Sequence, residues 1–371
     1  MSPIADLRPA GIQACGCLTP LGDAVSTLSA LLDGARALRP VPVLGSGGGD
    51  AVPLALMDSQ EMGESLPPRW LPALRRLLAG VPGERWGSPR FPVVVTSSNF
   101  GVGSLYAYLG SRDPAHLRHG APFACVEMLQ REFGWGEHVH TFSHACVSAH
   151  VGLLHASRLL QSGLAERVLV FTFDFVSPFV AGGFHSLKIL NSGMPAPYEA
   201  RAEGSIGLGD GAAFAVLTRD PAPLRIEAQA LHNEMRHFTG NQPDGSGFSV
   251  CAEAIAAAGG GRRLWVKGHG TGTLEAGRLE AEAFARALPG APLVSWKGSL
   301  GHTLGSCGLV ELALAIEALG ADRSPGTVGS RGPCFTGTVA LAPFPTRAYE
   351  GVVIASNAFG GAHAALLLCH A

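Results

Sequence analysis

The stretch HTFSHACVSAH, residues 140–150, joins a short β-rich segment to a helical pattern through a turn that contains Cys146. The helical spacing of small and apolar residues runs over Val147–Gln161, and Gly163 is placed to end that helix. A fully apolar segment, Arg167–Phe173, comes next and is typical of a strand buried on both faces. This order of strand, helix and strand predicts a layered α/β protein.

Units of the same kind lie on both sides of this stretch. Apolar segments at 11–17 and 91–96 are expected to be strands, and a helical pattern covers about 23–32. Residues 40–68 are rich in Pro, Gly and Ser and are expected to form irregular surface structure. Beyond about residue 220 the pattern begins again, with strands expected at 224–231, 263–267 and 351–355 and helices around 252–258, 279–288 and 309–319. The repetition predicts internal duplication, with an N-terminal half at 1–220 and a C-terminal half at 221–371.

The composition fits this interpretation and argues against several classes of protein. The chain has 371 residues, 47% of them hydrophobic, which is enough for a large core, and its 50 glycines suit many tight strand–helix turns. A net charge of −2 gives no electrostatic footprint for nucleic acid. No apolar run approaches the roughly 18 residues of a membrane span, and the N-terminus lacks the features of a secretory signal. The eight cysteines are scattered without a metal-ligand pattern, so we expect a cytoplasmic protein with no metal site.

Three separate glycine-rich settings contain the candidate chemical groups. Cys146 lies at a predicted helix start, where free N–H groups and the helix dipole favour the thiolate. His269 opens HGTGT after a predicted strand, and His302 lies in KGSLGHTLG, residues 297–305. Taken singly, the cysteine would be a packing residue and each histidine a structural residue of a turn. Brought together, they form a thiol nucleophile beside two imidazoles, a set that can build carbon–carbon bonds from thioesters.

The order of the motifs resembles that of the β-ketoacyl-acyl carrier protein synthases of the elongating type, which belong to the thiolase superfamily. The motifs that carry the resemblance run along nearly the whole chain: TPLG (19–22), ACVSA (145–149), PYEA (197–200), GDGA (209–212), HGTGT (269–273), GHTLG (301–305) and SNAFGG (356–361). The resemblance implies a five-layered αβαβα thiolase fold with internal duplication and an active site between the halves.

The resemblance also implies roles for individual residues. Cys146 would be the nucleophile, and His269 and His302 would be neutral donors to a thioester oxygen that becomes negative. Lys297 would lie beside the imidazoles and keep them neutral, and Glu280 could pair with Lys297. A solvated lysine and a surface carboxylate are the alternatives for these two.

The last glycine motif implies a second oxyanion hole, formed by the N–H of Cys146 and that of Ala358 or Phe359. Gly360 and Gly361 would let the main chain approach closely. The motif is about two residues shorter than the family pattern and ends in Ala362-His363 where Thr-Asn is common. The sequence therefore leaves open whether Phe359 is the gate of the acyl site, and a plain turn is the alternative for the whole loop.

Several other polar residues are expected to be structural. Asp174, Glu203 and Asp210 are interpreted as paired or capping, and His144 and His150 as capping the turn at the nucleophile rather than lining an acyl tunnel. A family cluster of basic residues that docks the carrier protein is reduced to Arg69, Arg75 and Arg76. The cysteines outside the motif are expected to be packing residues: Cys15, Cys17, Cys125, Cys251, Cys307, Cys334 and Cys369.

The predicted activity is decarboxylative condensation of an acyl-carrier protein with a malonyl-carrier protein. It needs no cofactor of its own, because the partner supplies the phosphopantetheine arm. The expected partners are an acyl carrier protein and a second ketosynthase-like subunit, in a homodimer or a heterodimer. The altered loop favours a polyene or type II polyketide pathway over bulk fatty acid synthesis. Two alternatives remain: a non-catalytic chain-length subunit, and a thiolase or thioester hydrolase that uses the same thiol.

Overall fold

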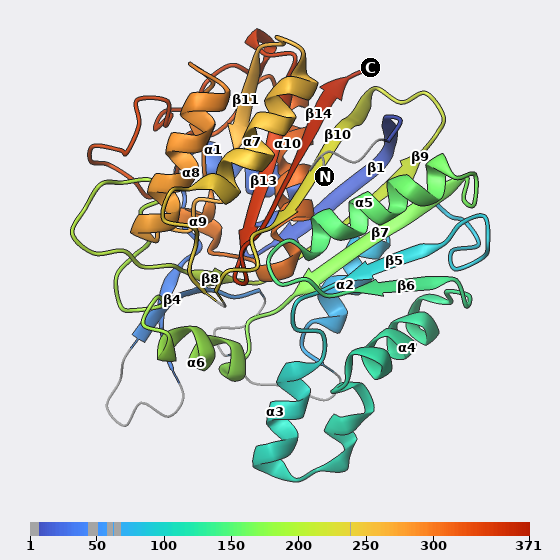
Figure 1. Cartoon of the computed structure of the whole chain (residues 1–371). Coiled ribbons are helices and arrows are strands. Elements are labelled where there is room, and N and C mark those ends of the chain that lie inside the picture. The colour runs from blue at the N-terminus through green and yellow to red at the C-terminus, as the bar shows by residue number, and fades with distance from the viewer. Residues whose placement is uncertain (1–6, 44–50, 58–61, 63–67, 238) are drawn as a thin grey trace.

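Ten strands line up in one continuous sheet that crosses the whole molecule (Figure 1), in the order β12-β11-β13-β14-β10-β1-β9-β7-β5-β6. The computed structural model describes residues 7–43, 51–57, 62, 68–237 and 239–371. The strands of the first half are β1 (Ala10–Thr19), β5 (Val93–Thr96), β6 (Val139–Phe142), β7 (Arg167–Asp174) and β9 (Gly211–Thr218), with β2 (Gly22–Asp23) beside β1. Those of the second half are β10 (Leu224–Asn233), β11 (Leu264–Lys267), β12 (Leu293–Val294), β13 (Gly351–Ala358) and β14 (Ala362–His370).

The two halves of this sheet have the same topology. Numbered within each half, both sets of strands lie in the order 3-2-4-5-1. The directions also match, because β5 is parallel to β6 and β7 just as β11 is parallel to β12 and β13, and the remaining pairs within each half are antiparallel. The halves join where β1 pairs with β10. This correspondence confirms the internal duplication predicted from the repeated pattern.

Helices cover the outer faces of the sheet and fill the space between its halves. They are α1 (Ala24–Leu32), α2 (Leu71–Leu78), α3 (Val102–Ser111), α4 (Pro122–Phe133), α5 (Ser148–Gln161), α6 (Pro178–Ser186), α7 (Ser246–Gly259), α8 (Leu274–Ala287), α9 (Lys297–Leu300) and α10 (Cys307–Gly320). Short 3₁₀ turns are η1 (Pro114–His119), η2 (Leu304–Ser306) and η3 (Thr346–Ala348). In the middle layer α10 packs on α5 and on strands of both halves, while α7 covers β10 and β14 and α2 covers β9. This arrangement is the predicted five-layered α/β architecture.

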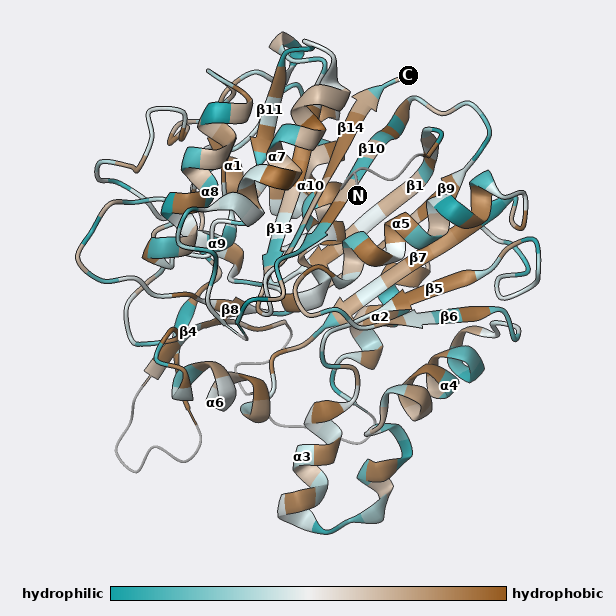
Figure 2. Ribbon diagram, viewed as in Figure 1, coloured by the Kyte–Doolittle hydropathy of each residue, from teal (hydrophilic) through white to brown (hydrophobic). Residues whose placement is uncertain are grey.

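The alternation of side chains along each strand builds these layers. Val94 contributes to the central core with α5 and α10, whereas its neighbours Val93 and Val95 pack in the outer core with α2 and α4. In the second half Ile354 faces the central core and Val353 faces α7 and α8. Because both faces are covered, the strands are apolar along most of their length (Figure 2). The fully apolar segments of the sequence therefore predicted the sheet correctly.

Residues 40–68 are more regular than expected where the structure describes them. β3 (Arg39–Pro42) and β4 (Ala51–Ala55) form an antiparallel pair, and β4 pairs in parallel with β8 (Leu208–Gly209) to complete a small three-stranded sheet. Residues 44–50, 58–61 and 63–67 of this stretch lie outside the described part. Leu54 and Leu208 pack together in a buried cluster, so the expectation of irregular structure was wrong for β3 and β4.

Asp210 holds the small sheet to the large one. Its carboxylate accepts hydrogen bonds from the N–H groups of Met57 and Val176 and from the Arg69 guanidinium at 2.7 Å. Asp210 is fully buried and the Arg69 side chain is 9% exposed. The structural role expected for Asp210 is confirmed, whereas Arg69 is an internal ion-pair partner rather than a docking residue. Among the residues that the structure describes, no helix is long and apolar enough to cross a membrane.

Candidate active site

Cys146 lies where β6 turns into α5, as the sequence predicted. The turn places Ala145 at a φ of 45°, and Ser148 closes it by donating its hydroxyl to the Ala145 carbonyl and accepting the N–H of His144. Cys146 belongs to a small buried cluster that includes Ala358 of β13. The nucleophile candidate of the first half thus lies in one cluster with the end of a strand of the second half.

His269 is positioned by the carboxylate of Glu280 from α8. Glu280 accepts the N–H of His269 at 2.6 Å and that of Gly270 at 2.9 Å, which fixes the loop after β11. Gly270 has a φ of 36°, and a Cβ there would lie 2.6 Å from the Cβ of Ser295. Glycine is therefore required at this turn, and the HGTGT motif has a direct physical cause.

His302 is positioned by backbone contacts with the loop before β9. Its N–H donates to Gly207 and its carbonyl accepts from Gly209, at 2.7 and 3.0 Å. The preceding Gly301 has a φ of 70°, and a Cβ there would lie 2.5 Å from the Leu208 carbonyl carbon. The glycine again permits a close approach of two main chains, here between the two halves of the protein.

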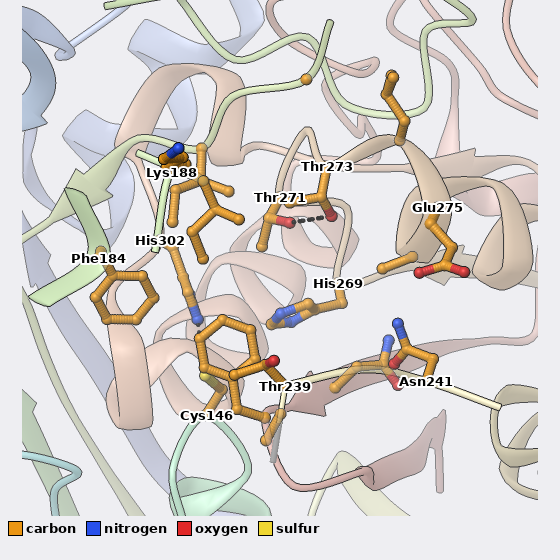
Figure 3. Close-up of a pocket in the computed structure, with 18 residues that line it drawn as sticks. Cys146, Phe184, Lys188, Thr239, Asn241, His269, Thr271, Thr273, Glu275 and His302 are labelled. Atoms are coloured by element: carbon orange, nitrogen blue, oxygen red, sulfur yellow. Dashed lines mark hydrogen bonds between the residues drawn. The ribbon is translucent and has the colours of Figure 1, made fainter. Parts of the chain in front are cut away.

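The three side chains meet in one pocket (Figure 3). His302 Nε2 lies 3.0 Å from Cys146 Sγ, and the rings of His269 and His302 pack edge to face with centroids 4.9 Å apart. All three residues are at least 92% buried. Nδ1 of each imidazole has no hydrogen-bond partner among the described residues, so no second contact fixes either tautomer. The structure thus brings together the cysteine and both histidines that the sequence singled out.

The electrostatics of the pocket differ from the expectation for Cys146. Burial raises the pKa of its thiol, and the neighbouring Cys307 adds to the rise, whereas Lys297 opposes it. Burial therefore opposes the thiolate that the start of α5 was expected to favour. The pKa values of His269 and His302 lie well below the usual range, through burial first and then the positive charge of Lys297. Neutral imidazoles beside a protonated thiol are the resting state that these shifts imply.

Lys297 is buried beside the imidazoles as expected, but its partner is not Glu280. Its Nζ contacts Oε1 of Glu311 on α10, at 2.5 Å. Glu280 instead accepts four hydrogen bonds, from the N–H groups of His269 and Gly270, the Tyr198 hydroxyl and the Asn357 amide. The predicted pairing of Lys297 with Glu280 is thus replaced by Lys297 with Glu311. Sequence analysis missed Glu311, which is the buried one of the two glutamates of α10 and is flanked by apolar residues, and that setting was the available signal.

The last glycine motif forms the turn between β13 and β14, at Phe359–Gly361. Gly360 and Gly361 have φ values of 84° and 72°, and a Cβ on Gly361 would lie 2.9 Å from that of Glu234. Ala358 and Phe359 line the pocket beside Cys146. The ring of Phe359 is 37% exposed and stacks on Phe184 of α6, with centroids 5.7 Å apart. Phe184 also lines the pocket, so this aromatic pair forms part of its wall.

We expect Phe359→Ala to widen the pocket that Cys146 lines. The variant should raise the rate at which a bulky maleimide alkylates Cys146 by about two- to tenfold, because an aromatic pair is worth about 0.5–1.5 kcal/mol. Phe184→Ala is the matched control, since it breaks the same pair from the other side and should act alike. Equal alkylation rates in both variants and the native protein would show that this pair does not gate the thiol.

Other predictions near the nucleophile need correction. Cys307 was expected to be a packing residue, yet its thiol donates to the carbonyl of Cys146 at 3.4 Å. His150 does not cap the turn, because its Nε2 bonds the Ser356 hydroxyl at 3.1 Å, and burial lowers its pKa to about 3. His144 Nε2 contacts Asn233 at 3.3 Å. Both histidines thus tie the nucleophile segment to the second half.

Asp174 has the structural role that was expected. Its carboxylate accepts hydrogen bonds from the loop after β5, at Ser97, Ser98 and Asn99, and burial raises its pKa to about 6. Within the described ranges, no cluster of three or more His, Cys, Asp or Glu side chains could hold a metal ion.

Comparison with known proteins supports the family resemblance. Residues 225–330 match the family model for the β-ketoacyl synthase C-terminal domain. The chain is 28% identical over 289 residues to the granaticin polyketide putative β-ketoacyl synthase 1 of Streptomyces violaceoruber, which covers 69% of this chain and 68% of that protein. It spans about half the length of several other curated relatives that it matches.

Solved structures show the same fold. The ketosynthase ApeO in complex with its chain length factor ApeC, from Xenorhabdus doucetiae, aligns with a TM-score of 0.78 at 21% identity, over 98% of both chains. The type II polyketide complex AntDE:AntF, an acyl-carrier protein with its ketosynthase, aligns with a TM-score of 0.84 at 14% identity, over 99% of this chain and all of that one. With the thiolase fold and the matched C-terminal domain, the chain is a relative of the β-ketoacyl synthases.

Proposed function

We propose that this chain is a β-ketoacyl-acyl carrier protein synthase that lengthens an acyl group by decarboxylative condensation with a malonyl thioester. The observation that carries the proposal is the 3.0 Å contact between Cys146 Sγ and His302 Nε2, with His269 packed against His302 in the same pocket. A thiol, a base at hydrogen-bond distance and a second donor are the minimal groups for acyl transfer followed by carbanion formation.

In the first half-reaction the Cys146 sulfur attacks the carbonyl of an acyl thioester on the carrier protein. The thiol proton passes to His302 Nε2 and then to the departing phosphopantetheine sulfur, so the carrier leaves as a free thiol. The acyl group stays on Cys146 through a new thioester bond. The N–H groups of Cys146 and of Ala358 or Phe359 stabilise the tetrahedral oxyanion in this scheme.

In the second half-reaction a malonyl thioester loses carbon dioxide. The electrons of the broken carbon–carbon bond form an enolate, whose oxygen accepts hydrogen bonds from His269 and His302. The enolate carbon then attacks the acyl group on Cys146, which forms the new carbon–carbon bond and releases the cysteine sulfur as a thiolate. A proton taken up from solvent returns Cys146 to the thiol. The chemistry uses no metal or organic cofactor of this chain, because the partner brings the phosphopantetheine arm.

The pocket suits such an arm. Thr271 and Thr273 present hydroxyl groups along it, and their oxygens lie 3.3 Å apart. Ile189 and Ile206 supply apolar surface on the same walls. A chain of two amides joined by short alkyl segments needs alternating polar and apolar contacts of this kind.

The proposed partners are an acyl carrier protein and a second ketosynthase-like subunit. The solved complexes AntDE:AntF and ApeO–ApeC contain such partners. In this chain β6 is the last strand of the sheet and leads directly to Cys146, and Leu109 and Phe179 lie exposed on the neighbouring helices α3 and α6. A subunit that paired with β6 would complete the sheet beside the nucleophile. We place this assembly in the cytoplasm.

Two other functions fit the pocket less well. A chain-length subunit would need no nucleophile, whereas Cys146 lines the pocket within reach of His302. A thiolase would need a second cysteine as acid and base in the pocket. Cys307 is fully buried, bonded to the Cys146 carbonyl and near Ser356, and does not line the pocket, so it is not placed for that role.

The decisive experiment is intact-mass analysis of the purified chain, alone and with a related subunit, after incubation with a panel of acyl-carrier protein thioesters. We expect one acyl group per chain, and a β-ketoacyl product only when malonyl-carrier protein is added. Preference for long or polyunsaturated acyl groups would support a polyketide or polyene pathway. Acylation followed by release of free acid without malonyl would instead indicate a hydrolase, and no acylation under any condition would indicate a chain-length subunit.

A further inference from the structure

Two buried lysines share one carboxylate directly behind the imidazoles. Lys297 Nζ and Lys267 Nζ contact the same oxygen of Glu311, Oε1, at 2.5 and 2.9 Å. The side chains of all three residues are at most 4% exposed. Lys267 is the last residue of β11, two residues before His269. One carboxylate facing two ammonium groups leaves a buried excess of positive charge.

The surroundings of Lys267 accommodate an ammonium group. Its Nζ also donates to the Gly268 carbonyl at 2.6 Å and lies 5.5 Å from the centre of the Trp296 ring. A carboxylate, a carbonyl and an aromatic face all favour a cation. Burial lowers the pKa of Lys267 to about 8 and Glu311 opposes that fall, so the ammonium form predominates at pH 7.

A second carboxylate, Glu280, lies on the other side of His269. Its oxygens face four donors: two backbone N–H groups, the Tyr198 hydroxyl and the Asn357 amide. Three of these donors are N–H groups that cannot accept, and their hydrogen bonds favour the ionised carboxylate. Burial raises the pKa of Glu280, and the hydrogen bonds together with Lys297 oppose that rise. Two lysines and two carboxylates therefore sum to zero charge.

We propose that Lys267 is a positioning residue that balances the charge of Glu280, so that the histidine pair works against a neutral background. Without Lys267, the remaining Lys297, Glu311 and Glu280 would carry one net negative charge beside the imidazoles. That charge would favour imidazolium and oppose the negative oxygen that forms at the histidines. Both lysines lower the pKa values of His269 and His302, as this arrangement requires. The inference rests on the proposed function only in its effect on catalysis.

The other titratable groups around this cluster do not supply the balance. Burial raises the pKa of Tyr198, and that of Cys307 to about 11, so both are neutral at pH 7. His363 lowers the pKa of His269, but its Nε2 bonds Glu234 at 2.9 Å with both side chains 1% exposed. Among the described residues, neither His363 nor Glu234 hydrogen-bonds to Lys267, Lys297, Glu280 or Glu311. Lys267 is thus the charge that offsets Glu280.

The test compares Lys267→Met, Glu311→Gln and the double variant with the native protein. Histidine ring NMR should show His269 and His302 titrating at higher pH in Lys267→Met and at lower pH in Glu311→Gln. In the double variant the cluster of lysines and carboxylates has no net charge, so both histidines should titrate near the pH of the native protein. Decarboxylation of malonyl-carrier protein should fall roughly tenfold in Lys267→Met, less than for loss of a direct donor, and recover in the double variant. The native rate should also fall as pH rises through about 8, where Lys267 loses its proton, and Lys267→Met should lack this limb.

If both histidines of Lys267→Met titrate at the same pH as in the native protein, the proposal is wrong. It is also wrong if the histidines of the double variant titrate no closer to the native pH than those of Lys267→Met. If Lys267→Met does not fold, Glu311→Gln decides alone, because imidazoles that titrate at the native pH or above would contradict the charge balance. A native protein without decarboxylase activity would refute the proposed function, whereas the histidine titrations would still judge Lys267.

Discussion

Replacing Cys146 with alanine should abolish acyl transfer to this chain. Incubation with acyl-carrier protein should leave the variant at its unmodified mass, and condensation should fall roughly 10³-fold or more, as expected when a nucleophile is removed. The cause is direct, because Cys146 is the cysteine that lines the pocket and lies 3.0 Å from His302 Nε2. Intact-mass analysis measures the first effect, and product formation from malonyl-carrier protein measures the second.

Cys307→Ala is the matched control for this prediction. Its thiol is also fully buried and touches the carbonyl of Cys146, but it lies outside the pocket lining. The control variant should still take up one acyl group. An acyl group found on Cys146→Ala would assign the nucleophile to another residue. Loss of acylation in Cys307→Ala, with the fold retained, would mean that the second thiol takes part.

The sequence predicted the sheet and the three catalytic candidates because both leave a local pattern. Buried strands such as β7 are apolar throughout, and His269 and His302 lie in turns where glycine is required by a close approach of the backbone. Internal duplication was likewise visible as a repeated order of elements. Features that depend on one segment alone, such as a buried strand or a tight turn, can be predicted from the sequence of that segment.

Contacts between distant segments were predicted less well. Several carboxylates lie within about twenty residues of Lys297, and only the three-dimensional structure shows that Glu280 accepts from other donors while Glu311 contacts Lys297. Helices α3 and α4 were also missed. For α4 the sequence did offer boundary signals, because Pro122 lies at its first position and Gly134 follows its last residue.

The two histidines should separate into different roles when each is replaced by alanine. His302 touches Cys146 Sγ, whereas the contact recorded for the His269 ring is with His302. His302→Ala should therefore slow both acyl transfer and malonyl decarboxylation, since it removes the proton acceptor and one donor. His269→Ala should spare acyl transfer but reduce decarboxylation by about 10²–10³-fold, the usual cost of losing one oxyanion donor. Rapid-quench acylation and carbon dioxide release measure the two steps.

His269→Asn provides the conservative comparison for the second role. An amide N–H can donate to the enolate oxygen without the basicity of an imidazole, so this variant should recover part of the decarboxylation lost in His269→Ala. Both variants should keep the native acylation rate, because neither changes the contact between His302 and Cys146. If His269→Ala lowered the acylation rate as much as His302→Ala, the two histidines would act together in acyl transfer. The separate roles inferred from their geometry would then be wrong. If neither variant affected decarboxylation, the enolate would have to be stabilised elsewhere in the pocket.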